Sequence, residues 1–90
     1  MKENVLVIHP LDNVAVALRT IGAGEQIIAS GLEGFLALES IPASHKVALR
    51  DIGQEEEIIK YGETVAVSIR PIKKGEWVHT QNLESKRWRK

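Results

Sequence analysis

A pattern of twelve residues recurs along this chain of 90 residues. Residues 16–27 and 47–58 are identical at eight of twelve positions, and residues 65–78 match residues 14–27 at seven of fourteen. Each copy contains an apolar segment, an Arg, an Ile, a tight turn that ends in Glu, and a second apolar segment. The Arg residues are separated by 31 and then by 20 positions. Because this spacing is unequal, the pattern predicts a compact duplicated β unit rather than a solenoid.

The turn of each copy has a simple structural explanation. Gly24 and Gly75 occupy the same turn position in two copies, and we predict a positive φ at both because glycine adopts that conformation at little cost. The repeated Ile and Val residues are predicted to form the core. Function is therefore sought in the residues that the copies do not share.

The composition limits what such a chain does alone. A domain of 90 residues buries only about 60–65% of the surface that its unfolded chain exposes, which leaves little room for a closed active site. Hydrophobic residues make up 43% of the chain and only 4% is aromatic, so we expect a globular protein with an aliphatic core. The chain has no Cys, which excludes disulfides and thiolate metal sites.

Charge and the N-terminal sequence bear on partners and location. Twelve basic and twelve acidic residues cancel, which argues against nucleic acid or an anionic membrane as a partner. Residues 85–90 form a basic C-terminal tail, expected to be a solvated end, with docking onto an acidic partner as the alternative. Residues 1–84 are expected to form one domain. The N-terminus has no signal-peptide pattern, and we expect a cytoplasmic protein.

Short apolar runs rich in β-branched residues predict a mainly β fold. Strands are expected within residues 5–8, 13–19, 26–29, 64–69 and 77–80, and residues 31–36 form either a tight loop or a marginal strand. The glycines near residue 24 favour a hairpin between the strands on either side of them. Glu55 to Tyr61 is expected to form one or two helical turns, ended by Gly62 as a C-terminal cap. Residues 82–90 are polar and are expected to be mobile.

The polar residues that differ between the copies cluster at strand ends, where a β scaffold carries its sites. His79 is followed closely by Asn82, and His45 precedes Lys46. An imidazole binds a divalent metal or moves a proton near neutral pH, and an ammonium group attracts a carboxylate. The other candidates are polar groups in loops: Asp12, Asn13, Lys60 and Tyr61. Asp12 and Asn13 also suit an ordinary turn, and no catalytic motif identifies an enzyme.

The order of several motifs resembles the SAF domain of the altronate and galactarate dehydratase family. The resemblance rests on four strings, namely His9-Pro10-x-Asp12-Asn13, Ile41-Pro42-Ala43-x-His45-Lys46, Ile59-Lys60-Tyr61-Gly62 and Gly75-Glu76-x-Val78-His79-Thr80-x-Asn82. It implies a β-clip fold and a sugar-acid hydro-lyase that commonly depends on a divalent metal such as iron or manganese. In such an enzyme His45, Lys46 and His79 are the expected catalytic residues, with the two histidines as candidate metal ligands. The expected substrate-binding residues are Asp12, Asn13, Lys60, Tyr61 and Asn82.

The resemblance also implies a partner. In that family the SAF domain is either the N-terminal part of one long chain or a small subunit beside a large one, and this chain is expected to be the separate small subunit. It would then bind a large dehydratase subunit and act on a small sugar acid, without activity of its own. Two alternatives stay open, which are the small subunit of a sulfolactate sulfo-lyase and a noncatalytic SAF module that binds a carbohydrate or a protein.

Overall fold

The protein is built from short antiparallel β-strands. The computed structural model describes residues 2–85, and these residues contain nine strands and no helix. The strands are β1 (Val5–Leu6), β2 (Val14–Ala17), β3 (Gln26–Ile27), β4 (Phe35–Leu36), β5 (Lys46–Ala48), β6 (Glu57–Lys60), β7 (Glu63–Ser68), β8 (Trp77–Val78) and β9 (Leu83–Ser85). The predicted mainly β fold is confirmed. No described segment is helical, so none offers a helix that would span a membrane.

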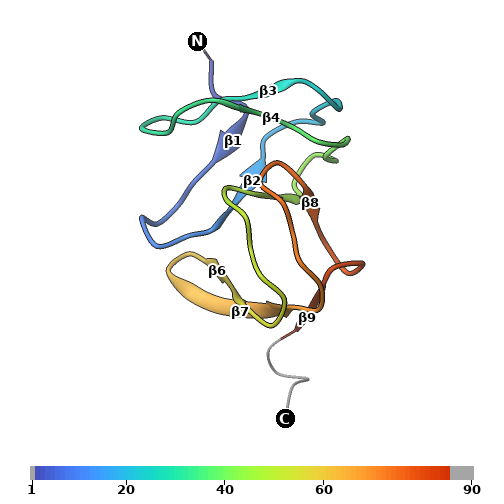
Figure 1. Cartoon of the computed structure of the whole chain (residues 1–90). Coiled ribbons are helices and arrows are strands. Elements are labelled where there is room, and N and C mark those ends of the chain that lie inside the picture. The colour runs from blue at the N-terminus through green and yellow to red at the C-terminus, as the bar shows by residue number, and fades with distance from the viewer. Residues whose placement is uncertain (1, 86–90) are drawn as a thin grey trace.

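The strands form three sheets. The central sheet has the order β1-β2-β5-β8, a second sheet pairs β3 with β4, and a third has the order β6-β7-β9. Figure 1 shows the central sheet between the β3-β4 pair at the top and the β6-β7-β9 sheet at the bottom. The central sheet therefore has neighbours on two sides.

The core is divided into two clusters by the central sheet. Val14 and Ala15 are adjacent in β2 yet belong to different clusters, and so do Val47 and Ala48 in β5. This division follows from the alternation of side chains along a strand, which places successive residues on opposite faces. Both faces of the central sheet are thus buried at its middle, which explains the nearly continuous apolar runs of β2 and β5.

The turns of the repeated pattern share one backbone conformation, and the structure shows four of them rather than three. A positive φ occurs three residues after each of four Ile residues, at Gly24 (83°), Ser44 (69°), Glu55 (66°) and Gly75 (90°). The predicted positive φ at the two glycines is confirmed. The additional turn begins at Ile41. The sequence there has diverged so far that it retains only the Ile and the three-residue distance from that Ile to the residue with positive φ.

The four copies associate in pairs through their Ile residues. Isolated bridges join Ile21 to Ile41 and Ile52 to Ile72, and all four side chains are fully buried. The predicted hairpin around Gly24 is wrong, because β2 and β3 belong to different sheets. The Gly24 N–H donates to the carbonyl of Ala37 in the next copy. Each copy therefore crosses from one sheet to another.

The predicted helical turns at residues 55–61 are also wrong. This segment contains β6, whose Ile58 is buried against β7 and whose Lys60 pairs with Glu63. Tyr61 (φ 58°) and Gly62 (φ 76°) form the two-residue loop of that hairpin, and two successive positive φ values are typical of a type I′ turn. Gly62 thus completes a hairpin rather than capping a helix. The β-branched pair at residues 58–59 outweighed the helix-favouring glutamates before it.

The C-terminal segment is more ordered than predicted as far as it is described. Asn82 is fully buried and β9 pairs with β7 through Leu83, Glu84 and Ser85. The rest of the predicted basic tail, residues 86–90, lies outside the described residues.

Candidate functional site

Three aromatic rings meet at the ends of β5 and β8. The two strands are antiparallel, with Lys46 opposite Val78 and Val47 opposite Trp77. One residue further along this register, His45 faces His79, and their ring centroids are 4.5 Å apart. Trp77 begins β8 and His79 directly follows its last residue, and their rings stack at 5.6 Å with an interplanar angle of 7°. The strand register thus brings both histidines together with a tryptophan.

The place of His45 in the repeat explains why this position is available for chemistry. In the other three copies the equivalent residue is a Glu (Glu25, Glu56 and Glu76) whose carboxylate accepts a hydrogen bond from a backbone N–H three residues earlier. In this copy the residue three positions earlier is Pro42, which has no N–H to donate. Because a carboxylate would have no turn donor to bind here, the position accommodates an imidazole.

The backbone around the rings is held by buried or half-buried side chains. The Trp77 N–H donates to Glu39 Oε2 at 3.0 Å, and the Trp77 carbonyl accepts from Asn82 Nδ2 at 2.8 Å. Asn82 Oδ1 in turn accepts from the His79 N–H at 2.9 Å. Glu39 stands where two other copies have an Arg that pairs with the turn Glu. The divergent copy thus contributes both the imidazole of His45 and the carboxylate that binds the backbone of Trp77.

Lys46 provides positive charge that reaches His79, and Lys60 provides positive charge that reaches Lys46. Lys46 follows His45, and its side chain lies on the other face of the central sheet, in a row with Val16 and Val78. Burial lowers the pKa of Lys46, and the charge of Lys60 lowers it further. The Lys60 ammonium lies 4.9 Å from the ring centroid of Tyr61, which is an exposed side chain. An anion near Lys46 and Lys60 would offset both the burial of charge and the repulsion.

The pKa of His79 is also lowered. The largest cause is burial, followed by the positive charges of His45 and Lys46. A depressed pKa favours the neutral imidazole near pH 7, which is the form that accepts a proton. His79 is therefore suited to act as a base.

The remaining predicted residues bind the backbone. The Asp12 carboxylate accepts from the Gly62 N–H at 2.8 Å and from the His9 N–H at 3.1 Å, which joins two loops. Asn13 is buried and bonds to the Glu57 carbonyl and the Ile59 N–H, each at 2.8 Å. Asp12 and Asn13 thus position the β6-β7 hairpin that carries Lys60 and Tyr61.

Asn82 forms the same pair of hydrogen bonds to the backbone as Asn13, and a third residue, Asn4, forms such a pair too. Asn4 Nδ2 donates to the Gln26 carbonyl and Asn4 Oδ1 accepts from the Ile28 N–H, each at 2.8 Å. We call Asn4, Asn13 and Asn82 the asparagine clamps, because each binds the strand that follows one of the repeated turns. The amide of Asn82 is committed to the backbone in the same way as the other two.

The described residues do not form a complete metal site. No group of three or more His, Cys, Asp or Glu side chains among residues 2–85 lies close enough together to hold a metal ion. The Nδ1 atom of His45 already accepts a hydrogen bond from the indole N–H of Trp77 at 3.1 Å. The donor set of this part of the chain therefore does not fit an iron or manganese centre by itself.

Sequence reasoning missed Trp77 and Glu39. Trp77 had a visible signal, because residues two apart in a strand share a face and Trp77 precedes His79 by two. Glu39 had none until the fourth copy was recognised from its Ile and its turn.

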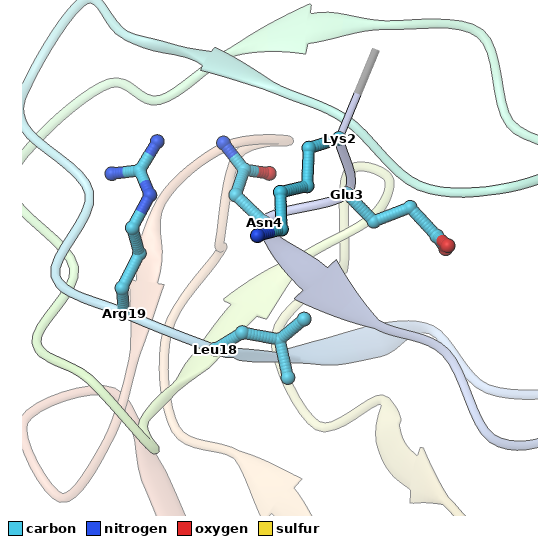
Figure 2. Close-up of a pocket in the computed structure, with 5 residues that line it drawn as sticks. All are labelled: Lys2, Glu3, Asn4, Leu18 and Arg19. Carbon is cyan, nitrogen blue, oxygen red and sulfur yellow. The ribbon is translucent and has the colours of Figure 1, made fainter.

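A pocket of about 410 Å³ lies elsewhere in the structure. Figure 2 shows Lys2, Glu3 and Asn4 along the segment that enters β1, with Leu18 and Arg19 on the segment that leaves β2. None of the rings or lysines described above lines it. Glu3 bonds to the Ser30 N–H and Arg19 pairs with Glu25, so these polar groups already have structural partners.

The chain belongs to the family of the altronate/galactarate dehydratase SAF domain, whose sequence pattern it matches over residues 3–86. It is 30% identical to the (2R)-sulfolactate sulfo-lyase subunit alpha of Chromohalobacter salexigens, and the match covers 91% of this chain and 95% of that protein. It is 42% identical to the galactarate dehydratase (L-threo-forming) of Escherichia coli over 79% of this chain, and 36% identical to the altronate dehydratase of Bacillus subtilis over 87%. The matched segments make up 13% and 16% of those two dehydratases.

Proposed function

We propose that this chain is the small subunit of a sugar-acid hydro-lyase, such as an altronate or related aldarate dehydratase, and acts with a separate large subunit in the cytoplasm. The observation that carries the proposal is the meeting of His45 and His79 beside the charge of Lys46 in a chain of the dehydratase SAF family. The separate large subunit is supported by the match to nearly the whole of a relative called subunit alpha. Relatives called dehydratases carry the same domain as a small part of a longer chain.

An elimination reaction gives a role to each of the lysines and to His79. Loss of water from a 2,3-dihydroxy acid removes the proton beside the carboxylate and the hydroxide from the next carbon. Negative charge builds on the carboxylate as the proton leaves, and positive groups stabilise that charge. In our proposal Lys46 and Lys60 bind the carboxylate, and neutral His79 accepts the proton.

In this proposal the small subunit does not supply every group that the elimination needs, and its partner supplies the rest. A divalent metal such as iron or manganese would supply Lewis-acid stabilisation of substrate oxygens, including the hydroxide that leaves. Since the described residues do not form a metal site, the large subunit would provide most or all of the ligands. The exposed surfaces of Lys60 and Tyr61 would face the substrate or that partner.

A sulfo-lyase is the second candidate, and one observation favours it. The matched sulfo-lyase subunit is covered over 95% of its length, whereas the dehydratases match with higher identity over the SAF portion alone. Proton removal beside a carboxylate is common to both reactions, and only the leaving group differs. The proposed roles of Lys46, Lys60 and His79 therefore hold for either.

The proposal is tested by reconstitution. The purified chain is mixed with a large dehydratase-like subunit, sought first in the neighbouring reading frame, and assayed with galactarate, altronate and sulfolactate. We expect no turnover by the chain alone and metal-dependent turnover of a sugar acid by the complex. Turnover of sulfolactate only would support the second candidate. Failure to bind any such subunit would favour a noncatalytic SAF module.

Variants then test the site within the active complex. His79→Ala is expected to keep the fold but to lower kcat by at least about a hundredfold, because it removes the base. Lys46→Ala is expected to act mainly on KM if the ammonium binds the carboxylate. Lys73→Ala changes an exposed lysine outside the site and is the matched control for Lys46→Ala. Full activity in the His79 variant would remove His79 from the reaction.

A further inference from the structure

The hydrogen bond between Trp77 and His45 determines the protonation pattern of that histidine. The indole Nε1–H of Trp77 lies 3.1 Å from His45 Nδ1. An indole nitrogen only donates, so the atom that faces it must be an acceptor. The opposite ring orientation would direct a C–H group at the indole N–H and lose the bond. In the neutral ring, His45 Nδ1 therefore carries no proton and the proton is on Nε2.

We propose that Trp77 is a positioning residue that holds His45 in the Nε2–H form, so that His45 donates a hydrogen bond to a carboxylate oxygen of the substrate. This inference rests on the proposed lyase function for the identity of the acceptor, but the tautomer itself does not depend on it. A His that binds a metal through Nε2 usually donates from Nδ1 to a carboxylate, carbonyl or water. The Trp77 bond imposes the reverse arrangement, so His45 serves as a donor and not as a metal ligand.

The two histidines consequently have different roles although they are in contact. His79 stacks on the face of the same indole that binds His45 through its edge. Glu39 and Asn82 hold the Trp77 backbone on both sides, so the indole is attached to a rigid frame. Trp77 thus keeps His45 as a donor, while the neutral ring of His79 accepts the proton.

The tautomer is measured by long-range 1H–15N correlation of the imidazole nitrogens in the 90-residue chain, at a pH where the rings are neutral. We expect Nε2–H alone at His45, and a slowly exchanging indole N–H at Trp77. In Trp77→Phe, which keeps an aromatic ring over His79, a fraction protonated at Nδ1 is expected at His45. His9 is an internal control, because its Nδ1 accepts from the Leu11 N–H at 3.1 Å and should not respond. An Nδ1–H tautomer in the wild type, or identical His45 signals in both proteins, would overturn the proposal.

The functional part is tested by kinetics in the reconstituted complex. Loss of one neutral hydrogen bond predicts that Trp77→Phe lowers kcat about two- to tenfold. His45→Gln places an amide donor near the position of Nε2 and is expected to retain at least about tenfold more activity than His45→Ala. Equal loss in both His45 variants would mean that His45 is not a simple donor. A complex without lyase activity would contradict the proposed function while leaving the tautomer result intact.

Discussion

Replacement of the asparagine clamps separates a structural role of Asn82 from a direct role in substrate binding. Each of Asn4, Asn13 and Asn82 is at most 3% exposed, and each binds one backbone carbonyl and one backbone N–H of the strand after a turn. Replacing any of them with Ala leaves both backbone groups without their partner. An unsatisfied buried polar group costs about 1–3 kcal/mol, so each variant is expected to lose about 2–6 kcal/mol of unfolding free energy.

Such losses are measurable in this domain. A chain of 90 residues is expected to have roughly 5–13 kcal/mol of stability, so most of these variants remain folded in water. A loss of about 3 kcal/mol lowers the urea midpoint by about 1–3 M for ordinary m-values. Unfolding is followed by circular dichroism on the isolated chain, where no partner or substrate is needed.

The three variants differ in what else they perturb. Asn82→Ala releases the His79 N–H and the Trp77 carbonyl, so it is expected to alter the imidazole signals of His45 and His79. Asn4→Ala and Asn13→Ala have the same cost but leave those signals unchanged, which makes them matched controls. If Asn82→Ala loses activity in the complex with less than about 1 kcal/mol of destabilisation, the clamp reasoning is refuted and a direct substrate contact is the better explanation.

Three further predictions concern the turns, pH and metal. Gly75→Ala is expected to lower the free energy of unfolding by about 3 kcal/mol or more, because an added Cβ at residue 75 meets the Leu36 carbonyl oxygen. Gly24→Ala is expected to lower it by about 1 kcal/mol, because an added Cβ at residue 24 meets nothing. Equal losses in thermal unfolding would contradict this. The lowered pKa of His79 means that the unfolded chain binds more protons, so stability falls as the pH decreases through about 6.5. His79→Gln should make this fall smaller when urea unfolding is measured at several pH values; a fall of unchanged size would argue against the lowered pKa. The isolated chain is expected to retain no Fe2+ or Mn2+ after dialysis, since residues 2–85 hold no ligand cluster; stoichiometric metal by elemental analysis would disprove that.

The local pattern predicted some features of the fold and not others. The positive φ at Gly24 and Gly75 follows from residue type, and β2 and β7 follow from apolar, β-branched runs. The partners of the strands were not predictable in this way, because the turn N–H groups bond to a different copy. The partner copy depends on the pairing of buried Ile residues that lie 20 positions apart, beyond the reach of a local pattern.

In the candidate site, too, the sequence predicted some features and not others. His45 and His79 were expected from chemistry and position, and the strand register brings their rings into contact. Asn13 and Asn82 were expected among the substrate-binding residues, whereas their burial and their bonds to the backbone are not visible in sequence. The hydrogen bond of Trp77 to His45 joins residues in different copies, and no local pattern encodes it.

The pairwise bridges between Ile residues have a consequence for how the domain opens and closes. Each bridge joins positions 20 residues apart, Ile21 with Ile41 and Ile52 with Ile72, so each half closes over a short loop at a modest cost in chain entropy. His45 belongs to the first half, whereas Trp77 and His79 belong to the second. The halves are joined by the pairing of β5 with β8, by the bond of the Trp77 N–H to Glu39 and by the bonds of Asn13 to the backbone of β6. The three rings are therefore in contact only when both halves are in place. A fluctuation that opens the pairing of β5 with β8 separates the donor His45 from the base and the indole, even where the Ile bridge within each half stays closed.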